Sequence, residues 1–157
     1  MKRHPQSGKK IIGYVSYLPI IINHESEKKE VYLGIENRYY FQEMPDFDEI
    51  GIILKEFDGG RIRYWHDVGH AAVQENLGIC RQKDLLEAYS DKIIGIHFHD
   101  VEDLHDRLSP GTGWIAYEEI IPLCKPSSLK MIEVGAGVSK EELLEGAGFM
   151  RAKFLLS

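Results

Sequence analysis

The sequence predicts an α/β fold in which a parallel β-sheet is covered by helices. Short β-branched runs alternate with helical segments four times between residues 31 and 145. A carboxylate or a histidine stands at the end of each run. The chain has 157 residues, of which 43% are hydrophobic, which is enough for one domain with a buried core. Because parallel strands need long crossover connections, the alternation predicts successive βα units.

The first unit begins with the apolar run Val31–Ile35, which predicts a strand ending at Glu36. Residues 46–57 then space their apolar side chains along one helical face, and Asp46 is a good N-cap residue. The sequence Asp58-Gly-Gly60 ends the predicted helix.

The second unit begins with Ile62–His66, a second predicted strand. Asp67 and His70 follow at its end. The segments 71–77 and 83–89 have the apolar pattern of helices that cover the sheet.

The third and fourth units follow the same order. A strand is expected over residues 93–98, a long polar loop over 99–113 and a short amphipathic helix over 117–123. The fourth strand is expected over 129–134. Ser139 and Glu142 fit a capping box that opens a helix running through Leu144 toward the C-terminus.

The first 30 residues follow this scheme less well. The apolar segment Ile11–Ile22 contains Gly13 and Pro19 and fits either a strand or a packed helix. Residues 25–30 form a charged run that we interpret as a solvated surface. We treat residues 1–157 as a single domain in which residues 31–145 carry the regular pattern.

Composition excludes several classes of protein. The chain has 19 Lys and Arg against 25 Asp and Glu, a net charge of −6, which argues against a free-standing nucleic-acid binder. No apolar run approaches the roughly 20 residues of a membrane span. Cys80 and Cys124 are far apart and lack metal-type spacing, so we expect a reduced, cytoplasmic setting with both thiols buried.

Chemically competent side chains occupy all four predicted strand ends. The carboxyl ends of parallel strands share one edge of a sheet, where α/β proteins place their chemistry. Three carboxylates and one imidazole suit Mn²⁺, Mg²⁺ or Co²⁺ better than a thiolate-held zinc, although Zn²⁺ also accepts such ligands. His97 and His99 have the same strand parity, so the pattern alone does not choose between them. The strand-end residues are Glu36, Asp67 with His70, His97 with His99, and Glu133.

These strand ends resemble the successive motifs of the xylose isomerase-like TIM-barrel superfamily. The superfamily includes sugar epimerases, sugar-phosphate isomerases and abasic-site endonucleases of the endonuclease IV type. The match runs over about residues 31–145, in the family's order. The motifs are Gly34-Ile-Glu-Asn37, His66-Asp-Val-Gly-His-Ala71, Ile96-His-Phe-His-Asp100, Pro110-Gly-Thr-Gly113 and Ile132-Glu-Val134.

The resemblance implies a role for each matching position. It implies a divalent metal held by Glu36, Asp67, His97 and Glu133, and it favours His97 over His99 because the family's ligand stands three residues before an Asp, here Asp100. Glu36 and Glu133 would also exchange protons with a sugar or sugar phosphate. His70 and Arg107 would bind the substrate. A surface charge in a polar loop is an equally good interpretation of Arg107.

The resemblance also implies an incomplete barrel. A complete (β/α)₈ barrel usually has about 250 residues, and the matching motifs belong to the second half of the family's barrel. The sequence therefore predicts a partial barrel of about four βα units. A half barrel exposes sheet edges and an apolar interior, so we expect either a homodimer or a complementing half barrel.

Two further interpretations remain open from the sequence. The first is a catalytically silent half-barrel fragment, suggested by the length of the chain. The second is an endonuclease IV-like abasic-site phosphodiesterase. That enzyme type has an Asp-x-His pair in the loop before the glycines, where this chain has His105 and Arg107. The isomerase or epimerase is therefore the preferred interpretation.

Overall fold

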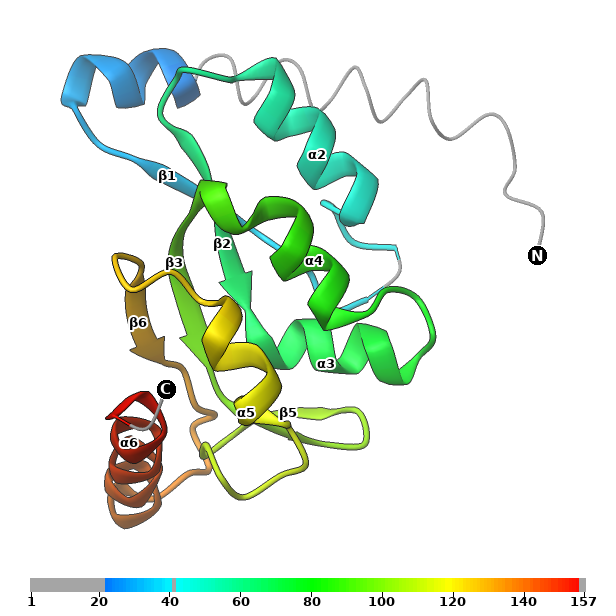
Figure 1. Ribbon diagram of the computed structural model, residues 1–157, viewed down its shortest axis with the longest axis vertical. Helices are drawn as coiled ribbons and strands as arrows, with labels where there is room; N and C mark the ends of the chain where they lie inside the picture. Colours follow the sequence, from blue (N-terminus) through cyan, green and yellow to red (C-terminus); the bar gives the residue numbers. More distant parts are fainter. Residues whose placement is uncertain (1–21, 41, 156–157) are drawn as a thin grey trace.

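Four parallel strands form the sheet on which the molecule is built (Figure 1). The computed structural model describes residues 22–40 and 42–155, so the open interpretation of residues 11–21 lies outside the described part. The sheet order is β1-β2-β3-β6, and every neighbouring pair is parallel. The strands are β1 (Leu33–Glu36), β2 (Ile62–Asp67), β3 (Ile93–Phe98) and β6 (Leu129–Ile132). The four predicted strands are therefore confirmed, although β1 begins two residues later than expected.

Helices connect the strands and cover one face of the sheet, with α2 and α4 lying side by side over it in Figure 1. The short helix expected over 117–123 divides into α5 and a 3₁₀ turn, η2 (Ile121–Leu123). Another 3₁₀ turn, η1 (Ser90–Lys92), leads into β3. The α-helices that follow β1 are α2 (Phe47–Glu56), α3 (Val68–Asn76), α4 (Gln82–Tyr89), α5 (Tyr117–Ile120) and α6 (Lys140–Leu155).

Both predicted helix starts are confirmed by their caps. The Asp46 carboxylate accepts a hydrogen bond from the Glu49 N–H at 2.9 Å, and the Glu49 carboxylate accepts one from the Asp46 N–H at 2.9 Å. At the start of α6, Ser139 and Glu142 exchange the same two kinds of bond. Each capping box satisfies backbone donors that the first helical turn leaves without partners.

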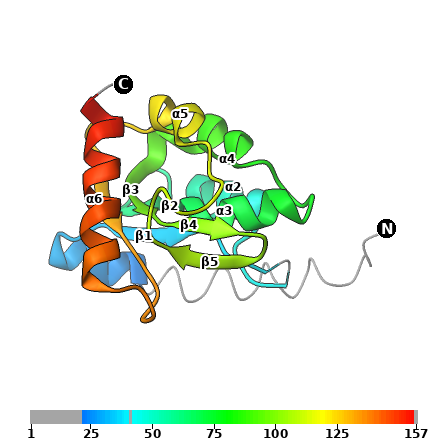
Figure 2. The same ribbon diagram turned by 90° about the horizontal axis from the view of Figure 1, so that it is seen from below.

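The segment expected as a polar loop after β3 contains a β-hairpin. Strands β4 (Asp100–Glu102) and β5 (His105–Leu108) pair antiparallel and lie beside α3 at the end of the sheet toward which the strand arrows point (Figures 1 and 2). The Asp100 carboxylate then accepts hydrogen bonds from the backbone N–H groups of Val101, Gly111 and Ile115. One buried carboxylate thus organises the loop after the hairpin, and it accepts the hydrogen bond of the Gly111 amide.

The core lies between the sheet and its helices. Tyr64, Phe98 and Tyr117 are among the largest fully buried side chains. Residues of the opposite parity face the other side of the sheet, where Leu129 and Met131 are 61% and 50% exposed. A parallel sheet is normally covered on both faces, so the exposed side chains mark the interior side of a partial barrel.

Other sequence predictions are settled by burial. Residues 22–29 are helical, and the charged side chains of residues 25–30 are exposed as expected. Cys124 is buried, whereas Cys80 is only partly so, and burial raises the pKa of both thiols to about 11. None of the helices in the described ranges is long and apolar enough to cross a membrane.

Candidate metal centre

Three side chains from strands β1, β2 and β3 and one from the residue directly after β6 meet at the carboxyl end of the sheet. The Nδ1 atom of His97 lies 2.9 Å from Glu36 Oε1, 2.9 Å from Glu133 Oε2 and 3.5 Å from Asp67 Oδ2. One potential ligand atom from each of these residues lies within 4.8 Å of all the others. The structure therefore brings together all four residues for which the family resemblance implies metal binding.

The three carboxylates of this cluster change the pKa of the histidine that lies among them. The carboxylates of Asp67 and Glu36 raise the pKa of His97 to about 9, because an imidazolium is stabilised by nearby negative charge. Burial alone would raise the pKa of Asp67, but its close contacts with His97, at 3.5 Å, and with His99, at 2.8 Å, hold that pKa well below its usual value. A protonated His97 consequently supplies positive charge among three carboxylates.

One buried oxygen supports the fit of a divalent ion. The carboxylate of Asp67 is fully removed from solvent. Its Oδ2 atom has no hydrogen-bond partner within the described ranges. Its nearest basic neighbour is Nδ1 of His97, at 3.5 Å, and a buried carboxylate oxygen without a hydrogen bond is costly unless a cation lies close to it. Because this oxygen faces the other three candidate ligands, the donor set fits a hard or borderline divalent metal.

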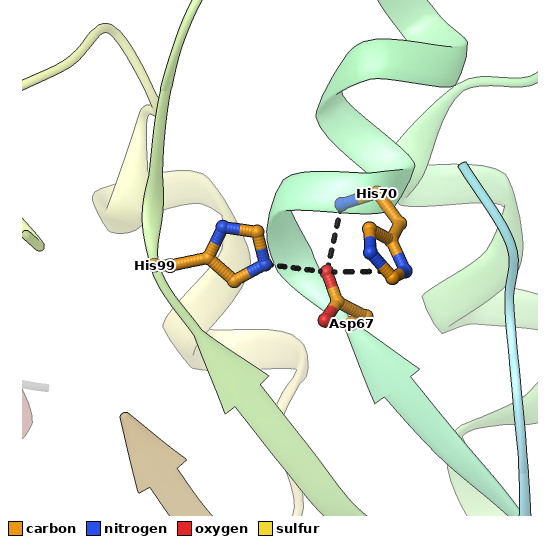
Figure 3. Close-up of side chains that lie close together, drawn as sticks. All are labelled: Asp67, His70 and His99. Atoms are coloured by element: carbon orange, nitrogen blue, oxygen red, sulfur yellow. Dashed lines mark hydrogen bonds and ion pairs between the residues drawn. The ribbon is translucent and has the colours of Figure 1, made fainter. Parts of the chain in front are cut away.

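The second oxygen of Asp67 has a different use (Figure 3). Asp67 Oδ1 lies 2.7 Å from the backbone N–H of His70, which it caps at the start of α3, and 2.8 Å from Nε2 of His99. His99 and His70 approach this oxygen from two sides. Neither donor contacts Asp67 Oδ2, so Oδ1 is engaged by residues of the chain while Oδ2 has no hydrogen bond in the described residues.

Both histidines of β3 and its end therefore contact Asp67, through different oxygens. His97 is the one in the cluster, as the resemblance implies, and His99 is fully buried behind it. His97 thus lies with Glu36, Asp67 and Glu133, whereas His99 lies with Asp67 and His70 in a second, fully buried group that could also hold an ion, so the choice of His97 as the metal ligand stays a prediction. The alternation of side chains along a strand could not distinguish the two histidines, because β3 ends at Phe98, between them.

Asn37 is a residue that the sequence did not single out. Its side chain accepts a hydrogen bond from the Asp67 N–H at 2.8 Å and donates one to the Asp67 carbonyl at 2.9 Å. It is also a partner of the Tyr64 hydroxyl, at 2.9 Å. Asn37 thus ties the end of β1 to the end of β2. Its position directly after Glu36 was the available signal.

His70 lies beside the cluster but is already well occupied. Its Nδ1 atom is 3.0 Å from the carbonyl oxygen of Asn37, and its Nε2 atom is 3.5 Å from Asp106 Oδ2. Its side chain is only 4% exposed. The structure thus places His70 next to Asp67 and Asp106, the latter a residue that the sequence had not suggested.

Arg107 points toward the cluster rather than away from it. Its Nη2 atom lies 3.3 Å from Glu133 Oε1, the oxygen of Glu133 that does not contact His97. Arg38 stands in a corresponding position at the other side, with Nη1 3.6 Å from Glu36 Oε2. Each glutamate therefore lies between His97 and an arginine, and Arg38 was not foreseen from the sequence.

An indole ring lies next to the cluster on the interior side of the sheet. The rings of Trp65 and His97 contact each other edge to face, with centroids 5.0 Å apart. The indole fits because Gly95 has no side chain: a Cβ atom there would come within 2.2 Å of the Trp65 ring. Trp65 is therefore a natural optical probe of the site.

Comparison with known proteins identifies the fold. No family model and no curated protein matches the chain. Among solved structures, it is similar to the E. coli 3-keto-D-glucoside 4-epimerase YcjR in its apo form, with a TM-score of 0.67 and 12% identity. It is also similar to a D-tagatose 3-epimerase-like protein, with a TM-score of 0.70 and 18% identity.

These matches cover most of this chain but only part of the others. The first covers 84% of this chain and 50% of YcjR, and the second covers 86% of this chain and 51% of the D-tagatose 3-epimerase-like protein. The chain therefore spans about half the length of the solved structures that it matches. With four parallel strands and their helices, it has the fold of a partial (β/α)₈ barrel, similar to about half of each of these two structures.

Proposed function

We propose that this chain carries the metal and proton-transfer site of a divalent-metal-dependent sugar or sugar-phosphate isomerase or epimerase. The single observation that carries the proposal is the meeting of three carboxylates and one imidazole at the strand ends. Asp67 Oδ2, which is buried and has no hydrogen bond in the described residues, supports ligation by Glu36, Asp67, His97 and Glu133. Oxygen-rich ligation favours Mn²⁺, Mg²⁺ or Co²⁺, while Zn²⁺ is also compatible.

Glu36 and Glu133 are the proposed acid and base. They approach the cluster from β1 and from the end of β6, on either side of His97. A substrate carbon lying between them could lose its proton to one carboxylate and regain a proton from the other. A bound divalent ion would stabilise the negative charge that develops on the substrate oxygens. Proton exchange on opposite faces would invert the carbon, which is an epimerisation.

The two arginines are suited to control these glutamates and to bind substrate oxygens. Arg107 and Arg38 each contact the glutamate oxygen that does not face His97. Both side chains are partly exposed, so each can donate hydrogen bonds to a hydroxyl or a phosphate. We propose Arg107 and His70 as substrate contacts, as the resemblance implies; His70 would exchange its 3.5 Å contact with Asp106 for one with the substrate. The printed names of the two similar structures support a sugar substrate.

Catalysis is proposed to require a second half barrel. The interior side of the sheet presents Leu129 and Met131 to solvent, and β1 and β6 each pair with only one other strand in the ranges that the structure describes. A second copy of this chain or a complementing half would cover that face and close the sheet. The substrate would then be enclosed between the strand-end loops of both halves.

A solvent-exchange assay tests the function without knowledge of the product. The chain is incubated with Mn²⁺ in D₂O together with a panel of ketoses, aldoses and their phosphates, and deuterium incorporation at the carbon next to the carbonyl is followed by NMR. An acid–base isomerase or epimerase introduces deuterium there, because the abstracted proton exchanges with solvent. We expect Glu36→Gln and Glu133→Gln to abolish incorporation, and Glu102→Gln, an exposed carboxylate of β4, to retain it.

The alternatives predict different results from the same material. A catalytically silent half barrel would incorporate no deuterium with any sugar, even after Mn²⁺ binding had been demonstrated. An abasic-site phosphodiesterase would cleave DNA containing an abasic site in the presence of Zn²⁺. Turnover in Glu133→Gln equal to that of the wild type would refute the proposed proton transfer.

A further inference from the structure

We infer that His99 is a positioning residue that holds Asp67 and Arg107 in one geometry. The inference rests on the proposed function, in which Asp67 binds the metal and Arg107 the substrate. His99 itself faces neither solvent nor the cluster: it is fully buried, and its two ring nitrogens contact other residues of the chain. It acts through those two residues.

The first contact fixes the carboxylate of Asp67. Nε2 of His99 lies 2.8 Å from Asp67 Oδ1 (Figure 3). Because the N–H of His70 occupies the same oxygen at 2.7 Å, Oδ1 has two fixed donors. Rotation of the carboxylate is thereby prevented, and Oδ2 stays directed toward His97. Partners of this kind, one step removed from the metal, orient ligands and strengthen metal binding in many proteins.

The second contact fixes the backbone of Arg107. The N–H of Arg107 donates to Nδ1 of His99 at 2.7 Å, and the carbonyl of Arg107 accepts from Gly135 N–H at 2.8 Å. Arg107 has φ 61°, a left-handed conformation that costs free energy for a residue with a side chain. The two hydrogen bonds hold it there. That backbone directs the side chain toward Glu133.

The two bonds together define the state of the imidazole. A backbone N–H can only donate, so Nδ1 of His99 must offer a lone pair to Arg107. The proton of the neutral ring is then on Nε2, where Asp67 accepts it. The imidazole thus accepts a hydrogen bond from Arg107, the proposed substrate contact, and donates one to Asp67, the proposed metal ligand.

The surrounding chain is built to admit this ring. A Cβ atom on Gly69, in the first turn of α3, would come within 2.0 Å of the His99 imidazole. No rotation of a flexible side chain could relieve this approach, because the ring is held at both nitrogens. The absence of a side chain at Gly69 is therefore required for the bridge, by which we mean the two hydrogen bonds that join His99 to Asp67 and to Arg107.

Two substitutions separate the two contacts. Glutamine in His99→Gln can place its amide nitrogen near the position of Nε2, and asparagine in His99→Asn can place its oxygen near the position of Nδ1. We expect His99→Gln to keep Mn²⁺ affinity within about threefold of the wild type but to lose protection of the Arg107 amide from hydrogen exchange. We expect His99→Asn to retain that protection and to bind Mn²⁺ about 10–100-fold more weakly, the usual effect of losing a ligand's supporting partner.

Mn²⁺ affinity is measured by calorimetry and amide exchange by NMR of the metal-free chain. His99→Phe, which retains a ring but has no nitrogen, should lose both properties. If it keeps both, the inference is wrong. If the His99 variants fail to fold, as judged by circular dichroism, Gly69→Ala provides the second test, since it keeps the imidazole but displaces it and should weaken both properties. Unchanged Mn²⁺ affinity and amide protection in a folded Gly69→Ala would also overturn the inference.

The ring tautomer gives a readout that needs neither metal nor substrate. We expect the ¹⁵N shifts of His99 in the metal-free wild type to show a proton on Nε2 and a bare Nδ1. A proton on Nδ1 would overturn the bridge. If the wild type binds no Mn²⁺, the proposed function alone is refuted. The ¹⁵N shifts of His99 and the hydrogen exchange of the Arg107 amide still test the bridge.

Discussion

Glu36 and Glu133, which end the two outer strands of the sheet, both reach the same nitrogen of His97 at 2.9 Å. Between β1 and β6 stand two further strands, so a flat sheet would hold these carboxylates roughly 14 Å apart at the usual strand spacing. Their meeting reflects the curvature of a barrel wall. The site therefore depends on the bent sheet as much as on the side chains.

Mn²⁺ should stabilise the folded chain. A ligand that binds only the folded state at 100 times its Kd adds about 2.7 kcal/mol, which corresponds to about 5 to 10 °C in Tm for a chain of this size. A thermal melt with and without Mn²⁺ measures the shift. Glu133→Gln should remove most of it, and Glu102→Gln should not. An equal shift in Glu133→Gln would place the ion elsewhere.

Mn²⁺ binding should strengthen as pH rises. His97 must release its proton to ligate a metal, and the nearby carboxylates raise its pKa to about 9. The apparent affinity should therefore increase about tenfold per pH unit between pH 6.5 and 8.5, with close to one proton released per ion. Calorimetry in buffers of different ionisation enthalpy measures the released proton. An affinity independent of pH would contradict the assignment of His97.

The metal-free chain should show the opposite dependence in that pH range. A pKa of His97 raised from 6.5 to about 9 gives stability that is fully present below pH 6.5 and is lost as pH rises through 9. The lowered pKa of Asp67 gives stability that is present above its ordinary value of 3.8 and is lost as pH falls further. Urea unfolding of metal-free protein should therefore show a fall in stability from pH 6.5 to 9. A flat profile would argue against a protonated His97.

Trp65 should report on metal binding by its fluorescence. Its ring contacts His97 edge to face, and Trp114, the only other tryptophan, is 47% exposed. In Trp114→Phe, binding of Mn²⁺ or Co²⁺ should quench the remaining emission with the same midpoint as calorimetry. Trp65→Phe should show no such change. Quenching in Trp65→Phe but not in Trp114→Phe would mean that the ion binds near Trp114.

Gly95→Ala should destabilise the chain by about 1–3 kcal/mol, the usual cost of overpacking. The new methyl group would enter the Trp65 ring, at 2.2 Å from its nearest atom. Gly148→Ala provides the control, because nothing lies within 4 Å of its Cβ position in α6 and alanine favours a helix by about 0.5–1 kcal/mol. Urea unfolding compares the two. Equal stabilities would show that Trp65 can move aside without cost.

Leu129→Glu should prevent association if another half barrel covers the interior side. Leu129 is 61% exposed on that side of β6, and Leu144, 62% exposed on α6, is its matched control. Analytical ultracentrifugation of the purified chain should show a dimer that Leu129→Glu dissociates and Leu144→Glu does not. A wild-type monomer would exclude the homodimer and direct the search to a complementing half.

Sequence patterns predicted the regular elements because local chemistry determines them. The capping residues Asp46 and Ser139 and the β-branched runs specify their own helices and strands with little help from the rest of the chain. The hairpin β4–β5 was missed for the converse reason. Its polar residues lack an apolar alternation, and the adjoining loop is organised by the distant backbone contacts of Asp100.

The candidate site was predicted in its membership but not in its arrangement. Strand-end position selected Asp67 and the pair His97 and His99, and only the family resemblance favoured His97; the structure brings Asp67 and His97 together with the two glutamates. The supporting contacts of Asn37, Arg38 and His99 depend on how the strand ends curve and where the chain leaves the sheet. No local pattern contains that information.

Asp67 both caps α3 and belongs to the metal cluster, and loss of an N-cap typically costs 0.5–2 kcal/mol. Selection for folding alone would therefore keep this aspartate in a lineage that had lost all chemistry. Glu36 and Glu133 have no comparable structural duty, and without activity they would be free to drift. In related chains, the fate of these two glutamates should thus distinguish working descendants from silent ones, whereas a retained Asp67 would not.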